Sequence, residues 1–294
     1  MSVVLGPPRL VDVTPGGTEM RRRGRRRALV RGAIVAACLL YLTVVLVAPL
    51  VGIFLSAFSK GLPTVFETLT SPEVRHAFLL TFQITIVTLL VTTSLGAVTA
   101  WVLVRHRFVG RRIMNALVEL PLAMSPVTVG LACVLLFGRG GWFEPWFTAR
   151  GIQVIFALPS MILVTIFICI PFVIRSVAPV LEELGTEEED AARTLGASTT
   201  QTLFRVILPN IRWGLLYGIA LTTARSIGEI GAVLIVSGML KGQTETATIY
   251  VLTAFEERMD TEGYIVALTL AAISIVMLGV IEISKRRKIR EVMG

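Results

Sequence analysis

The chain has 294 residues, of which 54% are hydrophobic and only 16% are charged. Because soluble domains carry about a quarter charged residues, this composition excludes an ordinary soluble enzyme and a disordered protein. The net charge of +8 is compatible with nucleic-acid binding, but the basic residues are distributed as in a membrane protein, so we expect a lipid bilayer and no nucleic acid as partner.

Six stretches are apolar over the roughly 20 residues that a helix needs to span a bilayer. They cover residues 28–58, 77–104, 113–137, 154–178, 214–240 and 264–284. The predicted fold is therefore an all-α, polytopic membrane protein with six transmembrane helices. Residues 1–27 are expected to form a disordered basic arm, residues 28–58 a retained first transmembrane helix, and residues 285–294 a basic tail.

Basic residues are alternately frequent and rare in the segments between these stretches. The arm through Arg31 has eight Lys and Arg, the next five segments have two, four, two, four and two, and the tail has five. Cytoplasmic segments retain Lys and Arg because the translocation of these residues is unfavourable. We therefore expect a multi-pass protein of the bacterial cytoplasmic (inner) membrane, with both termini and the connections near residues 105 and 193 in the cytoplasm.

The cytoplasmic connection at residues 181–212 is predicted to contain two short helices. Six acidic residues lie within residues 182–190, and Thr186 and Glu189 have the spacing of a capping box, which starts a helix. Gly196 is expected to end this first helix, because glycine readily adopts the left-handed conformation of a C-terminal cap.

A second capping box, formed by Ser198 and Gln201, predicts a second helix that ends at Pro209. The loop also carries apolar side chains such as Leu195 and Phe204 between charged residues, a combination typical of a docking surface. The alternative is a solvated linker, although a linker needs neither two caps nor exposed apolar side chains.

This connection resembles the cytoplasmic Glu-Ala-Ala loop of the permease subunits of bacterial ABC importers. The match includes Asp190-Ala191-Ala192, Gly196 and, after nine residues, a segment that ends in Leu208-Pro209; Asp190 stands where the family has glutamate, with Glu189 beside it. The resemblance covers about residues 77–284 and implies a type I importer permease fold with a cytoplasmic coupling helix. It assigns coupling to an ATPase to Glu189, Asp190, Ala191, Ala192, Gly196, Leu208 and Pro209.

The chain lacks the signature of an ATPase. No lysine follows a glycine, so the Walker A motif is absent. We therefore expect a non-catalytic subunit that binds no cofactor or metal itself, with ATP and Mg²⁺ on a partner ATPase. A membrane enzyme would need catalytic or metal-ligating residues within the spans. An ion-coupled secondary transporter is the alternative of a different class, but it would leave the cytoplasmic connection without a purpose.

The span at residues 214–240 is unusually polar. It contains Thr222, Arg225, Ser226 and Glu229. An ionisable residue within a span is costly and normally faces protein or water. Arg225 and Glu229 are four residues apart and can pair on one helix face. They are predicted either to form a structural ion pair or to border the translocation path.

A second resemblance indicates the substrate. Residues 224–233 and 236–238 resemble the branch of permeases for sulfate, thiosulfate and molybdate, and residues 209–218 and 241–244 most resemble the W-type subunits of sulfate importers. This implies a pore shared with a T-type permease subunit, two ATPase subunits and a soluble sulfate-binding protein. The alternative substrate is molybdate, tungstate or another oxyanion.

Three further features have open interpretations. Glu119 is expected either to pair with a basic loop residue near the cytoplasmic face or to line a path. Trp142 and Trp146 are predicted to lie in an interfacial belt or to help dock the binding protein. Gly214 and Gly218 form a small-xxx-small pair, which favours close packing of helices.

Overall fold

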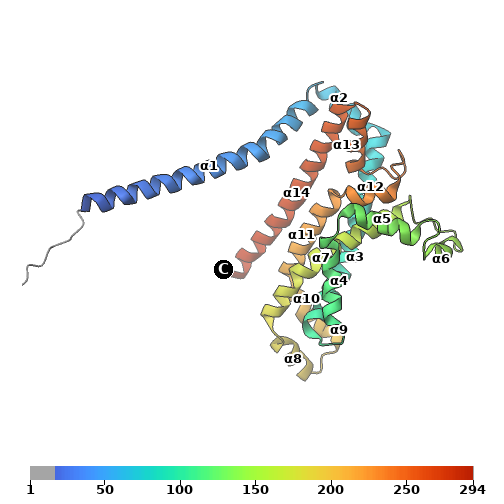
Figure 1. Ribbon diagram of the computed structural model, residues 1–294. Coiled ribbons are helices and arrows are strands. Elements are labelled where there is room, and N and C mark those ends of the chain that lie inside the picture. The colour runs from blue at the N-terminus through green and yellow to red at the C-terminus, as the bar shows by residue number, and fades with distance from the viewer. Residues whose placement is uncertain (1–16, 294) are drawn as a thin grey trace, which may run out of the picture. The chain divides into compact units, whose positions relative to one another are not determined.

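A computed structural model describes the backbone of residues 17–293 and the side chains of residues 30–283 (Figure 1). The described elements are the helices α1 Gly17–Ala57, α2 Leu62–Thr70, α3 Pro72–Arg105, α4 Arg111–Ala123, α5 Pro126–Phe137, α6 Glu144–Thr148, α7 Leu158–Leu184, α8 Glu187–Thr194, α9 Thr199–Thr202, η1 Leu203–Ile207, α10 Leu208–Asn210, α11 Arg212–Ile227, α12 Gly231–Ser237, α13 Ala247–Glu256 and α14 Asp260–Met293. The prediction of an all-α membrane protein is confirmed over this part of the chain.

The two ends of the chain differ from the prediction. The arm was predicted to be disordered, but α1 begins at Gly17, so residues 17–27 are helical. Residues 1–16 lie outside the described part. The tail is not a separate segment, because α14 continues to Met293. In each case a long apolar helix extends into a basic flank, since helix propagation adds one hydrogen bond for each residue that is ordered.

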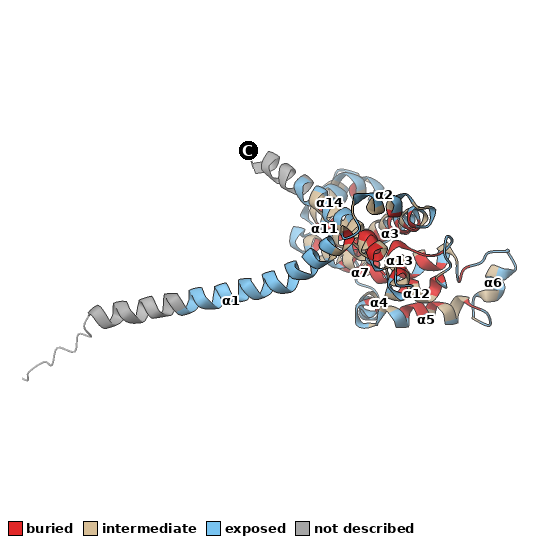
Figure 2. Cartoon of the chain, turned by 90° about the horizontal axis from the view of Figure 1, so that it is seen from above, coloured by how far each residue is buried: buried red, intermediate tan, exposed pale blue. Residues whose placement is uncertain are grey.

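Helix α1 forms a separate unit as far as Gly52. Its apolar stretch, Val30–Ala57, is long enough to span a bilayer, and none of its most apolar window is buried. Leucines such as Leu39 and Leu40 are 60% and 66% exposed, and Figure 2 shows α1 as exposed over residues 30–52. A helix that is apolar and unburied in this way suits contact with lipid.

The second unit is built around α3 and α7, which pack along each other, with α11 against both. Glycines allow the close approach of these helices. A Cβ atom at Gly96 would lie 2.8 Å from Val173 Cβ, and one at Gly214 would lie 2.7 Å from the Ser176 carbonyl oxygen. With Gly218 also against Val173, the predicted packing role of the Gly214–Gly218 pair is confirmed.

Two of the six predicted spans are broken rather than continuous. The stretch at 113–137 consists of α4 and α5, bent by 114°, and the stretch at 214–240 consists of α11 and α12, bent by 52°. Pro126 begins α5, and Ser125 before it is extended, because a proline disfavours helical geometry at the residue that precedes it. The structure therefore has four long apolar helices among its described residues, or six spans when each bent pair counts as one.

Candidate functional site

The connection at residues 181–212, which is predicted to be cytoplasmic, folds as two short helical segments. Helix α8 begins after Thr186, and the second segment consists of α9, the π-helical turn η1 and α10. Gly196 separates the two with a φ of 82°, as predicted for a left-handed C-terminal residue. The Ser198–Gln201 capping box is also confirmed, since each side chain bonds to the other residue's backbone.

Two local predictions for this loop are wrong. Thr186 makes no side-chain cap to α8, because its backbone is in the helical region (φ -112°, ψ -2°) rather than in the extended conformation of a capping residue. The reciprocal half of the box is also missing, since the Glu189 carboxylate binds Arg105. Pro209 does not end the second helical segment but lies within α10. The preceding π-helical turn, in which the Leu208 N–H donates to the Leu203 carbonyl, widens the helix and accommodates the proline.

Glu189 is the internal anchor of the loop. Its Oε1 accepts a hydrogen bond of 2.7 Å from Nε of Arg105, at the end of α3. The two side chains are only 6% and 9% exposed. Arg105 also donates to the Gly185 carbonyl, and Asn210 donates to Glu188, so the base of the loop is tied to α3 and to its own C-terminal end. Glu189 is therefore not free to substitute for the neighbouring Asp190 at the loop surface.

The tip of the loop exposes apolar side chains. Leu195 is 88% exposed and Phe204 is 61% exposed, while Leu208 is 37% exposed. Asp190 is also exposed, 3.6 Å from Arg193 one turn later. Ala191, Gly196 and Pro209 are exposed and Ala192 is half-buried. The structure thus separates the predicted coupling residues into one buried anchor, Glu189, and an accessible surface.

Glu229 organises the polar centre of the bent span that α11 and α12 form. One carboxylate oxygen, Oε1, accepts a hydrogen bond of 3.0 Å from the Ala232 N–H and so caps the start of α12. The other, Oε2, lies 2.7 Å from Nη2 of Arg225 as an ion pair without the alignment of a hydrogen bond. The Glu229 side chain is 1% exposed, whereas that of Arg225 is 33% exposed. The predicted pair exists, and its arginine keeps donors accessible.

Buried hydroxyl groups also lie on α11 and on α3, and those of α3 were missed from the sequence. Ser226 Oγ donates to Thr85 Oγ1 of α3 at 3.2 Å. The oxygens of Thr222 and Thr88 are buried without a hydrogen-bond partner. The buried threonines of α3 are Thr81, Thr85, Thr88 and Thr92. Their helical spacing within an apolar span was the signal that could have found them.

Other candidates lie apart from both sites. Glu119 pairs at 3.1 Å with Arg175, which is in helix α7 rather than in a loop as predicted, and both side chains are exposed. Trp142 is 85% exposed, and the Arg150 guanidinium lies over the Trp146 ring at 3.9 Å. Among residues 30–283, no group of three His, Cys, Asp or Glu is placed to hold a metal ion.

The fold resembles solved ABC transporter structures. A chain of a bacterial alginate ABC transporter, crystallised with a periplasmic protein bound to an alginate pentasaccharide, matches with a TM-score of 0.76 over 90% of this chain and 96% of that chain. The sequence identity is 16%, so this likeness concerns the fold alone. The predicted importer permease fold is thereby confirmed.

Curated relatives are more similar in sequence. The sulfate transport system permease protein CysW of Synechocystis is 43% identical over 88% of this chain and 94% of the relative, and CysW of Escherichia coli K12 is 42% identical over 78% and 79%. CysT of E. coli K12 is 33% identical over 87% of this chain and 92% of the relative. Residues 92–290 match the family described as binding-protein-dependent transport system inner membrane component. The chain belongs to this family of multi-pass permeases of the inner membrane.

Proposed function

We propose that this chain is a permease subunit of an ATP-driven importer of sulfate and thiosulfate. The relatives named as sulfate permeases, at 40–43% identity, favour sulfate over molybdate or tungstate. Half of the translocation path would come from this chain and half from a T-type subunit like the CysT relatives. A soluble sulfate-binding protein would deliver the anion from outside.

Energy would come from two separate ATPase subunits, which bind ATP and Mg²⁺. The observation that supports this proposal is the loop of residues 181–212, whose tip exposes Leu195 and Phe204 while its base is anchored to α3 through Arg105. An exposed apolar surface on an anchored support is suited to receive force from a partner and pass it to the spans. Both termini and this loop would lie in the cytoplasm.

The Arg225–Glu229 pair would serve the translocation path. Glu229 is held by α12, and it positions Arg225, whose partly exposed guanidinium keeps free donors. Guanidinium and hydroxyl donors suit a tetrahedral oxyanion such as sulfate. The neighbouring Thr222 and Ser226 would complete a polar lining.

The substrate is tested by uptake of labelled sulfate in a strain that lacks this gene, with and without complementation. Uptake that returns with the gene and is competed by thiosulfate would support the proposal. Uptake of molybdate alone, or transport by the purified chain driven by an ion gradient without ATPase subunits, would overturn it.

The docking surface is tested separately with Leu195→Asp. This side chain is 88% exposed, so the substitution should leave the fold intact while it weakens co-purification of the ATPase subunits. Val109→Asp is the matched control, because Val109 is fully exposed in another connection predicted to be cytoplasmic. Equal co-purification of both variants would contradict docking at Leu195.

A further inference from the structure

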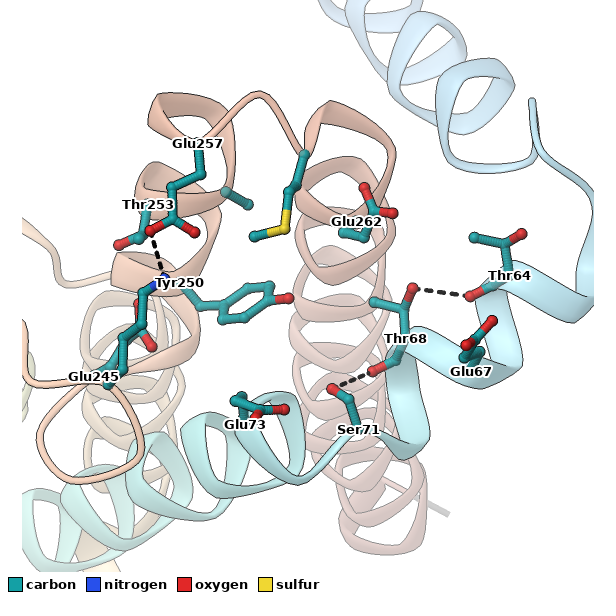
Figure 3. Close-up of a pocket in the computed structure, with 13 residues that line it drawn as sticks. Thr64, Glu67, Thr68, Ser71, Glu73, Glu245, Tyr250, Thr253, Glu257 and Glu262 are labelled. Atoms are coloured by element: carbon teal, nitrogen blue, oxygen red, sulfur yellow. Dashed lines mark hydrogen bonds and ion pairs between the residues drawn. The ribbon is translucent and has the colours of Figure 1, made fainter.

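A cavity of about 500 Å³ lies far from the cytoplasmic loop, between α2, α13 and the first turns of α3 and α14. Every residue that lines it comes from residues 59–76 or 241–263, two of the three connections predicted to lie outside the cell. Figure 3 shows Glu245 and Glu257 on one side, Glu67 and Glu262 on the other, and Glu73 below. On the predicted topology the cavity therefore belongs to the outer face of the permease.

The lining has an excess of negative charge. It contains five glutamates and a single basic residue, Lys241, whose ammonium group is already paired with Glu257. Lys60 lies 3.4 Å from Glu262 and compensates one further carboxylate. The remaining carboxylates have no basic partner among the lining residues. Gathering like charges in this way is unfavourable unless a cation joins them.

Two carboxylate oxygens in the cavity lack a donor. Glu245 is only 2% exposed, and its Oε1 is buried without a hydrogen-bond partner, as is Oε2 of Glu262. Burial raises the pKa of Glu245, although an interaction of its carboxylate with the Thr253 side chain acts in the opposite direction, and burial together with the Glu245 carboxylate raises the pKa of Tyr250. A buried carboxylate oxygen without a donor is costly, so its presence in a cavity wall points to a missing ligand that donates hydrogen bonds.

The arrangement does not suit a single metal ion. No three carboxylates in the described residues converge on one point. They are instead spread around a space of ligand size, and the wall between them includes the Tyr250 ring, Ala254 and Met259. Separated anionic groups with apolar surface between them match a chain of ammonium groups joined by methylene segments.

We propose that this cavity is a binding site for a linear polyamine, with one ammonium group at Glu245 and another toward Glu67 and Glu262. The apolar wall would contact the methylene chain. The site is independent of the sulfate assignment, since it lies at the opposite end of the spans from the coupling loop and requires neither ATP nor sulfate.

Calorimetric titration of spermidine into the assembled transporter, in nanodiscs of phosphatidylcholine without nucleotide, tests the site. We expect saturable binding, weakened about tenfold by Glu245→Gln, because a charge-assisted hydrogen bond is lost. Glu67→Gln combined with Glu73→Gln should weaken binding similarly. Both side chains are exposed, so this variant should fold even if Glu245→Gln does not.

Glu256→Gln is the matched control. Glu256 is an exposed carboxylate next to Glu257 and does not line the cavity, so its loss should leave spermidine binding unchanged. Absence of binding, equal weakening by the control, or displacement of spermidine by Mg²⁺ at constant ionic strength would overturn the proposal. Sulfate uptake measured on the same preparations separates this result from the proposed transport function.

Discussion

Arg105 and Glu189 lie 84 residues apart in the chain, yet their side chains meet at 2.7 Å where α3 ends and α8 begins. The pair is almost fully buried. It connects α3, one of the two longest helices of the second unit, to the loop that we propose as the ATPase contact. Movement of α8 would therefore be transmitted to α3 through a charged, hydrogen-bonded link rather than through the backbone alone.

Loss of this link should uncouple the transporter. Glu189→Gln should lower the number of sulfate ions imported for each ATP hydrolysed. It should also reduce stability by about 3–5 kcal/mol, because Arg105 keeps a buried charge without its partner. The measurements are uptake and ATP hydrolysis in proteoliposomes and unfolding in detergent. Glu187→Gln, an exposed change on the same helix, is the control and should alter neither quantity.

Gly196→Val should impair the loop through the backbone alone. Gly196 has a φ of 82°, and a Cβ atom there would meet nothing within 4 Å, so no steric clash is involved. A β-branched residue in the left-handed region costs about 1–2 kcal/mol, which should displace α8 and lower uptake. Gly196→Asn should be milder because asparagine tolerates this conformation. Uptake that is normal in the valine variant would argue against a conformational role.

The role of Arg225 can be separated from that of Glu229. Arg225→Ala leaves a carboxylate that is 1% exposed without its charge partner, so we expect poor stability and low uptake. Adding Glu229→Gln should restore stability, because glutamine removes the charge and can still accept from the Ala232 N–H. If uptake remains low in the stable double variant, Arg225 acts in transport; if uptake returns, the pair is only structural.

Close packing of α3 on α7 should be sensitive to one added carbon atom. Gly96→Ala would place a Cβ atom 2.8 Å from Val173 Cβ and should lower stability by about 1–3 kcal/mol, measured by thermal unfolding in detergent. Val173→Ala in the same chain should recover part of this loss. Gly279→Ala in α14, where nothing lies within 4 Å of the new atom, should be neutral or slightly stabilising.

Local patterns predicted much of the fold. Apolar length located the spans, and the Ser198–Gln201 box and Gly196 correctly predicted the two segments of the loop at residues 181–212. These features depend on residues within a few positions of one another, so they can be read from neighbouring residues. The Arg225–Glu229 pair was predictable for the same reason, because four residues make one helical turn.

Contacts between distant segments decided the rest. Thr186 and Glu189 have the spacing of a capping box, but Arg105 offers Glu189 a bond in which both groups are charged, and nothing near Glu189 in the chain indicates this partner. The acidic cavity likewise joins two connections that are far apart in sequence. Which charges become buried together depends on how the helices pack, and this packing sums many weak contacts that no short pattern contains.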